Sequence, residues 1–363
     1  MQKMINRLFK VAIIGAGIGK EHLNAFNTQM DRFSVKYICD LDVDKAKGLI
    51  SNNNTKITED YEEVLNDDEI DLIDICLPPD LHFEYVKKAL EAGKHAICEK
   101  PLAGSLEEVD QLIKISQITK KNIYPVFQYR FGKGTKQLNL LIESGLAGKP
   151  FVASLETYWN RDSNYYDNEW RGTWKGERGG AILGHAIHIH DLLTMVFGEI
   201  FSVYAKLSTR VNNIEVEDCA ALSIQMQNGS LVTSSITLGA ANDTSRLKFS
   251  FENLTATSGN SPYKPAEDTW SFEARKPNYQ KKIDEVIGNV ENIQSGYAGL
   301  FNEIANNLEG KKSNEVNLYD GRKSIEFVTA VYKSFNEDKN IILPIEKESI
   351  YYKSWIPKKY NKN

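Results

Sequence analysis

FKVAIIGAGIGKEH, residues Phe9 to His22, is the stretch that decides the fold. An apolar run rich in β-branched residues ends at Gly15, and Gly17 and Gly19 follow before polar residues resume. This pattern predicts a buried strand, a tight glycine turn and the start of a helix. Glycine is needed where the turn demands unusual backbone angles, and where a side chain would hold the backbone away from a pyrophosphate at the helix N-terminus. The stretch predicts a dinucleotide-binding turn, with an ordinary strand-to-helix junction as the alternative.

An acidic residue follows the second expected strand. The spacing of the glycines is G-x-G-x-G, which is shorter than G-x-G-x-x-G because Lys20 stands where the third glycine would fall. Residues Ser34 to Cys39 form an apolar run that ends at Asp40, where a dinucleotide-binding unit places an acid on the adenosine ribose. A carboxylate there accepts hydrogen bonds from the ribose hydroxyls and repels a 2′-phosphate. Asp40 therefore favours NAD over NADP, unless it is a solvated residue that caps the next helix.

Composition limits the class of protein. The chain has 363 residues, 41% hydrophobic and 26% charged, which is typical of a globular protein with two domains. A net charge of -5 gives no basic surface for nucleic acid, and no stretch is apolar over the length that crosses a bilayer. The four cysteines are isolated, so we expect buried thiols in a reducing compartment, a cytoplasmic location and no metal site built from them.

Strands and helices alternate through the first third of the chain. We expect strands at Leu72 to Leu77, His95 to Cys98 and Ile123 to Gln128, with helices between them. Such alternation predicts a parallel sheet with a ligand crevice at the carboxyl ends of the strands. The residues that directly follow the expected strands are Gly15 to Gly19, Asp40, Pro78 to His82, Glu99 to Pro101 and Gln128 to Arg130.

The pattern changes after Phe131. Consecutive long strands are expected there, and Asn228-Gly229 between two alternating runs indicates a hairpin. We therefore expect an antiparallel sheet in a second, α+β domain, whose face the amphipathic helices 296–309 and 320–336 cover. The expected boundary divides the chain into residues 1–130, a Rossmann domain, and residues 131–363, the second, α+β domain.

Three of the six histidines, His185, His188 and His190, lie in the stretch GGAILGHAIHIHD, which ends at Asp191. On one continuous helix His185 and His188 would share a face, as would His188 and Asp191, while His190 would point elsewhere. An imidazole suits transfer of a hydroxyl proton because its pKa lies near neutrality. The alternatives are packed histidines or a zinc site. The segment lacks the H-E-x-x-H order and a nearby cysteine, so we expect no metal.

WNRDSNYYDNEWRGTW, residues 159–174, is a second candidate for substrate binding. Aromatic rings suit the apolar faces of a sugar or polyol, and arginines and amides give its hydroxyls directional partners. The alternative is that these residues pack a long loop or a subunit interface. The candidate substrate residues are Trp159, Arg161, Tyr165, Tyr166 and Arg171.

Several motifs together resemble the Gfo/Idh/MocA family, the group of glucose-fructose oxidoreductase and inositol dehydrogenase. They are the glycine turn, ICLPPDLH ending at His82, AGKH-x-x-x-EKP ending at Pro101, GG-x-x-x-x-x-x-x-H-x-x-D and a late LP-I. The resemblance implies a Rossmann domain followed by an α/β domain whose open, largely antiparallel sheet often packs against another subunit. It also implies that Lys100 lies near the nicotinamide and the reacting hydroxyl, and that His188 is catalytic. An aspartate often found four residues before that histidine is Gly184 here, so His185 is the candidate to take its place.

The resulting hypothesis is an NAD-dependent dehydrogenase that oxidises a secondary hydroxyl of a sugar, sugar acid, cyclitol or derivative, and acts as a homodimer or homotetramer. Lys100 and His188 would handle the hydroxyl proton, and His185 would contact the substrate. Two alternatives stay open: an enzyme that uses tightly bound NAD as a transient redox relay, or a non-catalytic regulator that binds a dinucleotide. The expected cofactor residues are Gly15, Gly17, Ile18, Gly19, Asp40, Leu77, Pro78, His82, Glu99, Lys100 and Gln128.

Overall fold

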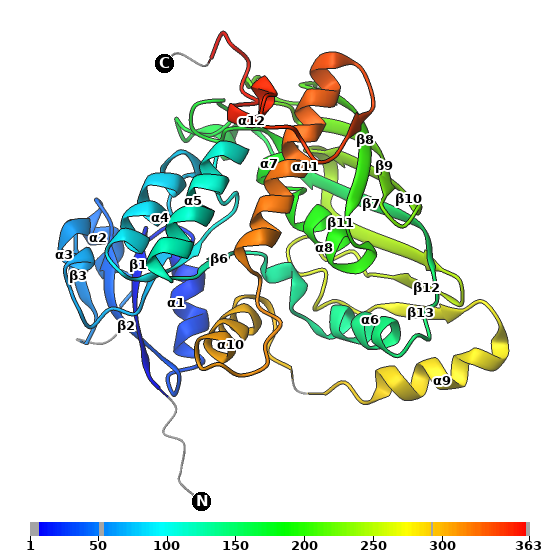
Figure 1. Cartoon of the computed structure of the whole chain (residues 1–363), viewed down its shortest axis with the longest axis horizontal. Helices are drawn as coiled ribbons and strands as arrows, with labels where there is room; N and C mark the ends of the chain where they lie inside the picture. Colours follow the sequence, from blue (N-terminus) through cyan, green and yellow to red (C-terminus); the bar gives the residue numbers. More distant parts are fainter. Residues whose placement is uncertain (1–6, 51–53, 292, 361–363) are drawn as a thin grey trace, which may run out of the picture. The chain divides into compact units, whose positions relative to one another are not determined.

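A computed structural model describes residues 7–50, 54–291 and 293–360. The described chain divides into two compact units (Figure 1). The first runs to Val126 and also includes Tyr297–Arg322, and the second comprises Phe127–Gly296 and the residues from Lys323 onward. The sequence analysis placed residues 297–322 in the second domain, whereas here they belong to the first unit.

The first unit contains a parallel sheet of six strands, which confirms the predicted Rossmann-type architecture. The strand order is β3-β2-β1-β4-β5-β6, so the order reverses between β1 and β4. Ligands of such sheets bind beyond the carboxyl ends of the strands at this reversal. The strands are β1 Phe9–Ile14, β2 Phe33–Cys39, β3 Lys56–Thr58, β4 Leu72–Ile75, β5 His95–Cys98 and β6 Ile123–Pro125; the helices are α1 Gly19–Asn27, α2 Val43–Lys47, α3 Tyr61–Leu65, η1 Pro79–Leu81, α4 His82–Glu91 and α5 Leu106–Thr119.

Helix α10, Gly296–Leu308, packs against α1 rather than over the second sheet. Phe301 stacks on Phe26 with ring centroids 4.0 Å apart, and Gln29 donates a hydrogen bond to the carbonyl of Ala298. The periodicity of α10 predicted an amphipathic helix correctly. It could not say which surface the apolar face would cover, because that partner lies far away in the sequence.

The second unit contains a mixed sheet of eight strands in the order β13-β12-β11-β7-β10-β9-β8-β14. Only the β10–β7 pair among those described is parallel, so the predicted, mostly antiparallel sheet is confirmed. Gly229, at φ +88°, closes the predicted hairpin between β9 and β10. The strands are β7 Pro150–Asn160, β8 Ile200–Ser208, β9 Cys219–Met226, β10 Leu231–Thr237, β11 Gly239–Phe251, β12 Leu254–Thr257, β13 Ser271–Ala274 and β14 Ile341–Ile342; the helices are η2 Gln128–Arg130, α6 Lys133–Glu143, η3 Ser163–Tyr166, α7 Ala181–Gly184, α8 Ile187–Phe197, α9 Pro277–Gly288 and α12 Ile350–Lys353. Helix α11, Leu318–Glu337, begins in the first unit and continues in the second from Lys323 onward.

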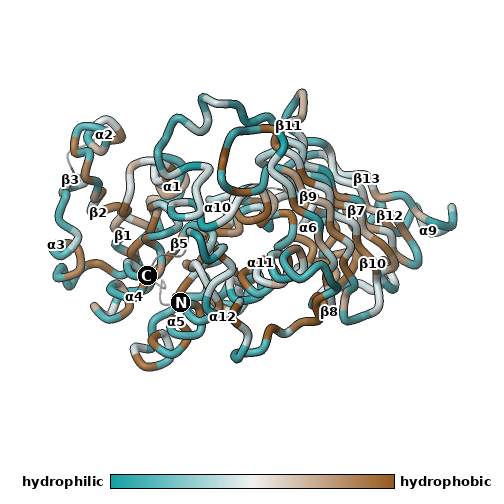
Figure 2. The backbone as a smooth tube through the Cα atoms, turned by 90° about the horizontal axis from the view of Figure 1, so that it is seen from above, coloured by the Kyte–Doolittle hydropathy of each residue, from teal (hydrophilic) through white to brown (hydrophobic). Residues whose placement is uncertain are grey.

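The two faces of this second sheet differ. Along β9, Leu222 and Ile224 are buried while Ser223 and Gln225 are exposed, in the alternation that a sheet covered on one face requires. Helices α7 and α8 contact β7, β9 and β10 and cover the apolar face. Figure 2 shows apolar segments along the strands of both units and more hydrophilic loops between them. Across the described ranges, no helix has the length and apolarity that a membrane span requires.

Candidate functional site

The glycine turn after β1 fits a dinucleotide. Gly15 has φ +102°, and a Cβ atom there would lie 2.4 Å from the carbonyl oxygen of Cys76, so only glycine is accommodated. At Gly17 the one atom within 4 Å of a built Cβ is Lys45 Nζ, at 3.8 Å, so this side of the turn is open to a ligand. Helix α1 follows at once, and its N-cap residue Ile18 makes no side-chain capping bond. The turn therefore presents the uncapped N-terminus of a nine-residue helix, which suits a pyrophosphate.

Asp40 lies beside this turn at the end of β2. Its carboxylate accepts hydrogen bonds from the backbone N–H groups of Ala16 at 2.6 Å and Asp42 at 2.8 Å. Asp42, rather than Asp40, caps α2 by accepting a bond from the N–H of Lys45 at 2.9 Å. The capping alternative for Asp40 is therefore wrong. Its carboxylate instead ties the glycine turn to the second strand, the position that the sequence analysis assigned to the ribose.

His82 does not offer its ring to a ligand. The side chain is fully buried, with Nδ1 2.6 Å from the carbonyl oxygen of Pro101 and Nε2 2.8 Å from that of Leu77. Burial lowers the pKa of His82 against the raising effect of these two carbonyl groups. The ring therefore joins the segment after β4, which includes Pro78, to the segment after β5. We expected direct contact between His82 and the cofactor, and the geometry gives it a structural task instead.

The Glu99-Lys100-Pro101 segment follows β5, and its Lys100-Pro101 peptide bond is cis. Glu99 is buried and accepts hydrogen bonds from the N–H of Lys100 at 3.0 Å and from the hydroxyl of Tyr297 at 3.3 Å. Lys100 is half-buried, and its positive charge contributes to lowering the pKa of His82. Lys100 therefore follows β5 at the carboxyl edge of the sheet, and its place beside the nicotinamide stays a prediction. Gln128, expected at the same edge, begins η2 and belongs to the second unit.

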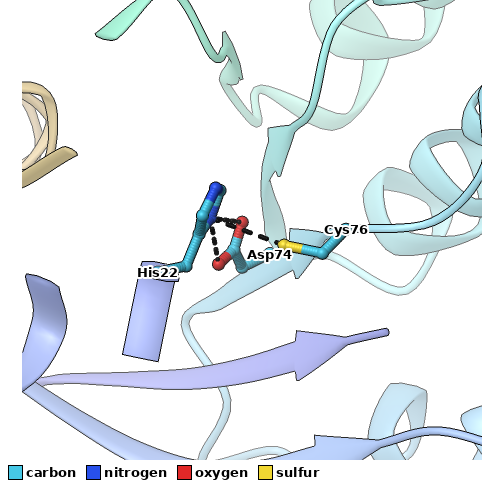
Figure 3. Close-up of side chains that lie close together, drawn as sticks. All are labelled: His22, Asp74 and Cys76. Carbon is cyan, nitrogen blue, oxygen red and sulfur yellow. Dashed lines mark hydrogen bonds and ion pairs between the residues drawn. The ribbon is translucent and has the colours of Figure 1, made fainter. Parts of the chain in front are cut away.

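Beneath the glycine turn lies a fully buried cluster of His22, Asp74 and Cys76, whose side chains point toward one another (Figure 3). His22 Nδ1 lies 2.9 Å from an Asp74 oxygen and 3.4 Å from Cys76 Sγ. Two ligand atoms on a tetrahedral ion with bonds of about 2.0–2.3 Å stand more than about 3.2 Å apart. The nitrogen–oxygen distance is therefore that of a hydrogen bond, and the cluster does not fit a metal without rearrangement.

The histidine segment is not one helix. Helix α7 ends at Gly184, His185 is its C-cap residue, and α8 begins at Ile187. The prediction that His185 and His188 share a helical face is wrong, because the chain turns between them. The break falls at His185 and Ala186, and periodicity alone did not reveal it.

The two candidate histidines have different aromatic neighbours. His185 contacts Trp159 edge-on at 5.2 Å and Tyr165 at 5.7 Å between ring centroids. His188 stacks on Tyr129 at 4.4 Å and meets the edge of Phe127 at 6.0 Å. Both side chains are buried, so each ring has a defined orientation within the second unit.

Asp191 and His190 have structural partners. Asp191 receives two hydrogen bonds from the guanidinium of Arg130, at 2.6 and 2.7 Å, which fixes α8 to η2. His190 Nε2 lies 3.0 Å from the hydroxyl of Ser234, and burial lowers the pKa of His190 to about 3. Asp191 thus positions α8 through its bonds to Arg130, and His190 is a neutral core residue.

The residues chosen from the 159–174 segment gather with His185. The Arg161 guanidinium lies 4.8 Å from the Trp159 ring and 5.1 Å from the Tyr165 ring. Burial works to lower the pKa of Arg161, but the bond to Asp243 at 3.0 Å outweighs it and the pKa is raised. We call this the aromatic–arginine cluster; its members are Trp159, Arg161, Tyr165, Tyr166, Arg171 and His185.

Sequence reasoning missed three residues of this region. The ring of Tyr263 lies tilted against that of Trp159, with centroids 4.9 Å apart, and its hydroxyl accepts a hydrogen bond from Arg161 at 2.9 Å; Asp243 accepts one from the same arginine at 3.0 Å. Glu217 is buried and accepts bonds from the N–H of Ile182 at 3.0 Å and from the N–H of Gly180, which fixes the start of α7. These residues lie far along the chain from the segments they hold, and no local motif marks them.

Comparison with known proteins agrees with this architecture. Residues 9–127 match the family described as "Oxidoreductase family, NAD-binding Rossmann fold", and residues 135–256 match the "GFO/IDH/MocA C-terminal domain". The chain belongs to the Gfo/Idh/MocA family of oxidoreductases. This confirms the resemblance, the two-part fold and the NAD-binding character of the first unit.

Individual relatives of this chain share no more than about a third of its residues over the aligned regions. An uncharacterized oxidoreductase, YrbE of Bacillus subtilis, is 30% identical over 60% of this chain and 64% of its own length. The scyllo-inositol 2-dehydrogenase (NADP(+)) IolW of Bacillus subtilis is 21% identical over 92% of this chain and 96% of its own. The WlbA dehydrogenase of Chromobacterium violaceum, solved with NADH and UDP-GlcNAcA, aligns with a TM-score of 0.83 at 25% identity, over 94% of this chain and 98% of its own. The match to YrbE thus covers less than two thirds of that relative.

Proposed function

We propose that the protein is an NAD-dependent dehydrogenase that oxidises a secondary hydroxyl of a sugar, sugar acid, cyclitol or derivative. The observation that carries the proposal is the set of groups at the carboxyl edge of the first sheet. An open glycine turn, the Asp40 carboxylate and the Lys100 ammonium follow three strands of one Rossmann sheet. NAD, when bound, supplies the acceptor for a hydride.

In this proposal the turn from Gly15 to Gly19 holds the pyrophosphate, and Asp40 holds the ribose. Lys100 stabilises the negative charge that develops on the substrate oxygen, and His188 takes or returns the hydroxyl proton. The stacking of His188 on Tyr129 supports an oriented ring. His185 contacts the substrate, because it belongs to the aromatic–arginine cluster.

The substrate class rests on the aromatic–arginine cluster and on two relatives. Stacked aromatic rings and guanidinium groups suit the apolar faces and hydroxyls of a carbohydrate or polyol. IolW is named for scyllo-inositol, and WlbA was solved with a nucleotide sugar. IolW is also named for NADP, so the preference of this chain for NAD rests on Asp40.

The experiment is an absorbance screen for NADH across sugars, sugar acids and cyclitols, with NAD and NADP, followed by variants on the best substrate. Lys100→Met and His188→Asn are each expected to lower kcat by about 10²- to 10⁴-fold, while NADH binding survives. Lys88→Met is the matched control, because Lys88 pairs with Glu62 on the exposed side of α4.

The double variant shows whether the two groups serve one step. If they do, the loss of kcat in the double variant Lys100→Met/His188→Asn is expected to be much smaller than the product of the losses in the two single variants. Near-normal turnover in Lys100→Met would remove the lysine from the mechanism. Protein that purifies with bound NAD but yields no net NADH would instead support the redox-relay alternative.

We further propose that the protein is a cytoplasmic homodimer or homotetramer that associates through the open face of the second sheet. Leu231 on β10 and Val152 on β7 are register partners, and their exposed fractions are 56% and 48%. Neighbouring exposed apolar side chains on a sheet face favour a subunit interface. Light scattering of the wild type and of Leu231→Lys tests this, and a monomeric wild type would contradict it.

A further inference from the structure

His22 stands at the centre of a buried set of charges in the first unit. Its ring lies between Asp74, whose oxygens are 2.9 and 3.1 Å from Nδ1, and Glu99, whose Oε1 is 3.2 Å from Nε2. All three side chains are buried, and that of His22 is fully so. A neutral imidazole has one N–H donor, and an ionised carboxylate only accepts. The ring can therefore donate to Asp74 from Nδ1 and to Glu99 from Nε2 at the same time only when both nitrogens carry a proton.

The surroundings of His22 agree with a charged ring. Burial by itself lowers the pKa of His22, but the charge and hydrogen bond of Asp74, together with Cys76, outweigh it and place the pKa well above its usual value. The aromatic ring of Tyr297 lies 4.5 Å away between centroids. The titratable groups that face the ring are thus Asp74, Cys76, Glu99 and Tyr297.

We infer that His22 is a positioning residue: a buried imidazolium, held between Asp74 and Glu99, that keeps Glu99 ionised and through it fixes the backbone of Lys100. The inference rests on the proposed function, because it assigns the catalytic group to Lys100. The carboxylate of Glu99 accepts a hydrogen bond from the backbone N–H of Lys100 at 3.0 Å, so the position of Glu99 restricts the backbone of Lys100. The hydroxyl of Tyr297 adds a second donor to the same carboxylate.

This arrangement connects two parts of the proposed site. His22 lies in α1, whose N-terminus would face the pyrophosphate, and Glu99 directly follows β5. A neutral side chain at position 22 would remove the positive charge that lies between the two buried carboxylates, which is unfavourable. Glu99 would then take up a proton or move, and the N–H of Lys100 would lose its charged acceptor.

The first experiment needs no substrate. Nitrogen-15 NMR of histidine-labelled protein distinguishes imidazolium from the two neutral tautomers. We expect the signals of a doubly protonated ring at pH 8, and we expect these signals to be missing in His22→Gln. Every histidine being neutral at pH 8 in the wild type would overturn the inference. Failure of the substrate screen would count against the proposed function alone.

The second experiment measures kcat, KM and the Kd for NADH. His22→Gln and Glu99→Gln are each expected to lower kcat at least tenfold, and His22→Gln is expected to keep the Kd for NADH within threefold of wild type. Because both act along one path, the double variant should lose no more than threefold beyond the worse single variant. Multiplied losses, or a kcat of His22→Gln within threefold of wild type, would contradict a positioning task.

The matched control is His95→Gln, which makes the same substitution in the same unit. His95 begins β5 at the opposite end from Glu99, and burial lowers its pKa to about 4, so its ring is neutral. Its kcat is expected to stay within threefold of wild type. An equal loss in His95→Gln would mean that the effect of His22→Gln is one of folding, and would overturn the inference. If His22→Gln fails to fold, the NMR measurement on the wild type still decides it.

Discussion

Replacing Asp40 with asparagine tests how the first unit recognises its cofactor. In the wild type the carboxylate accepts the backbone N–H of Ala16 at 2.6 Å and that of Asp42 at 2.8 Å. Asparagine keeps one acceptor oxygen and turns its NH₂ group toward the other donor. Hydrogen bonds to a charged acceptor contribute about 1.5–3 kcal/mol and neutral ones about 0.5–1.5 kcal/mol. These two bonds lie within the protein, so their loss weakens the turn. The Kd for NADH rises because the ribose hydroxyls also lose a charged acceptor, which for a half-exposed group is about 2 kcal/mol and corresponds to a roughly 30-fold higher Kd.

The same substitution changes the choice between cofactors. At a separation of roughly 5 Å in water, a carboxylate and a phosphate dianion repel each other by about 2 kcal/mol. The Asp40→Asn variant loses this repulsion, so the preference for NADH over NADPH is expected to fall about 30-fold. Fluorescence titration with both reduced cofactors measures the two constants directly, at one fixed ionic strength because the repulsion is screened by salt.

Asp42→Asn is the control for this prediction. It removes the same charge two residues away, from a side chain that caps α2 rather than holding the glycine turn. We expect both Kd values to change less than threefold and their ratio to stay as in the wild type. The reasoning about Asp40 would be refuted if Asp40→Asn left the NADH to NADPH ratio within threefold of wild type, or if the wild type itself preferred NADPH.

The remaining predictions concern stability and backbone geometry. Asp191→Asn removes the charge that the half-buried Arg130 guanidinium pairs with and is expected to destabilise the second unit by about 3 kcal/mol; an unchanged thermal unfolding transition would contradict this. Gly15→Ala places a methyl group 2.4 Å from the Cys76 carbonyl oxygen at φ +102°, so calorimetric titration should show NAD binding lost or weakened more than tenfold, and wild-type affinity would show that the turn adapts. Burial raises the pKa of Glu217 from 4.5 to about 7, so the stability present below pH 4.5 is lost as pH rises to 7. This loss is on the order of 3 kcal/mol; urea unfolding of Glu217→Gln should lack this decline, and parallel pH profiles for the two proteins would refute it.

The sequence determined the local structure of the first unit well, because its information is local. The strand His95–Cys98 has the predicted bounds, since its apolar run lies within the segment itself, and helix α5 begins after Ser105, whose side chain accepts a hydrogen bond from the N–H of Glu108. The glycine turn was predicted for the same reason. Its backbone angles and close approach to Cys76 permit no other residue at position 15.

The positions of the two candidate histidines could not be predicted from the local sequence. Residues at helical spacing predicted one face for His185 and His188, but the chain turns after Gly184 and gives the two rings different neighbours. Those neighbours, Tyr165 for one and Tyr129 for the other, come from segments that no spacing rule connects to the histidines.

Only the tertiary structure decided which distant charges meet. The charged groups that meet are separated by dozens of residues in the sequence. Examples are Arg130 with Asp191, Arg161 with Asp243, and His22 with the carboxylates of Asp74 and Glu99. A charged side chain in the protein interior needs an oppositely charged partner to be stable. The residues adjacent to it in the sequence do not identify that partner. The sequence determined which elements form and which residues end the strands. The packing of those elements decided which buried polar groups share hydrogen bonds, because that depends on distances between segments that the linear order does not contain.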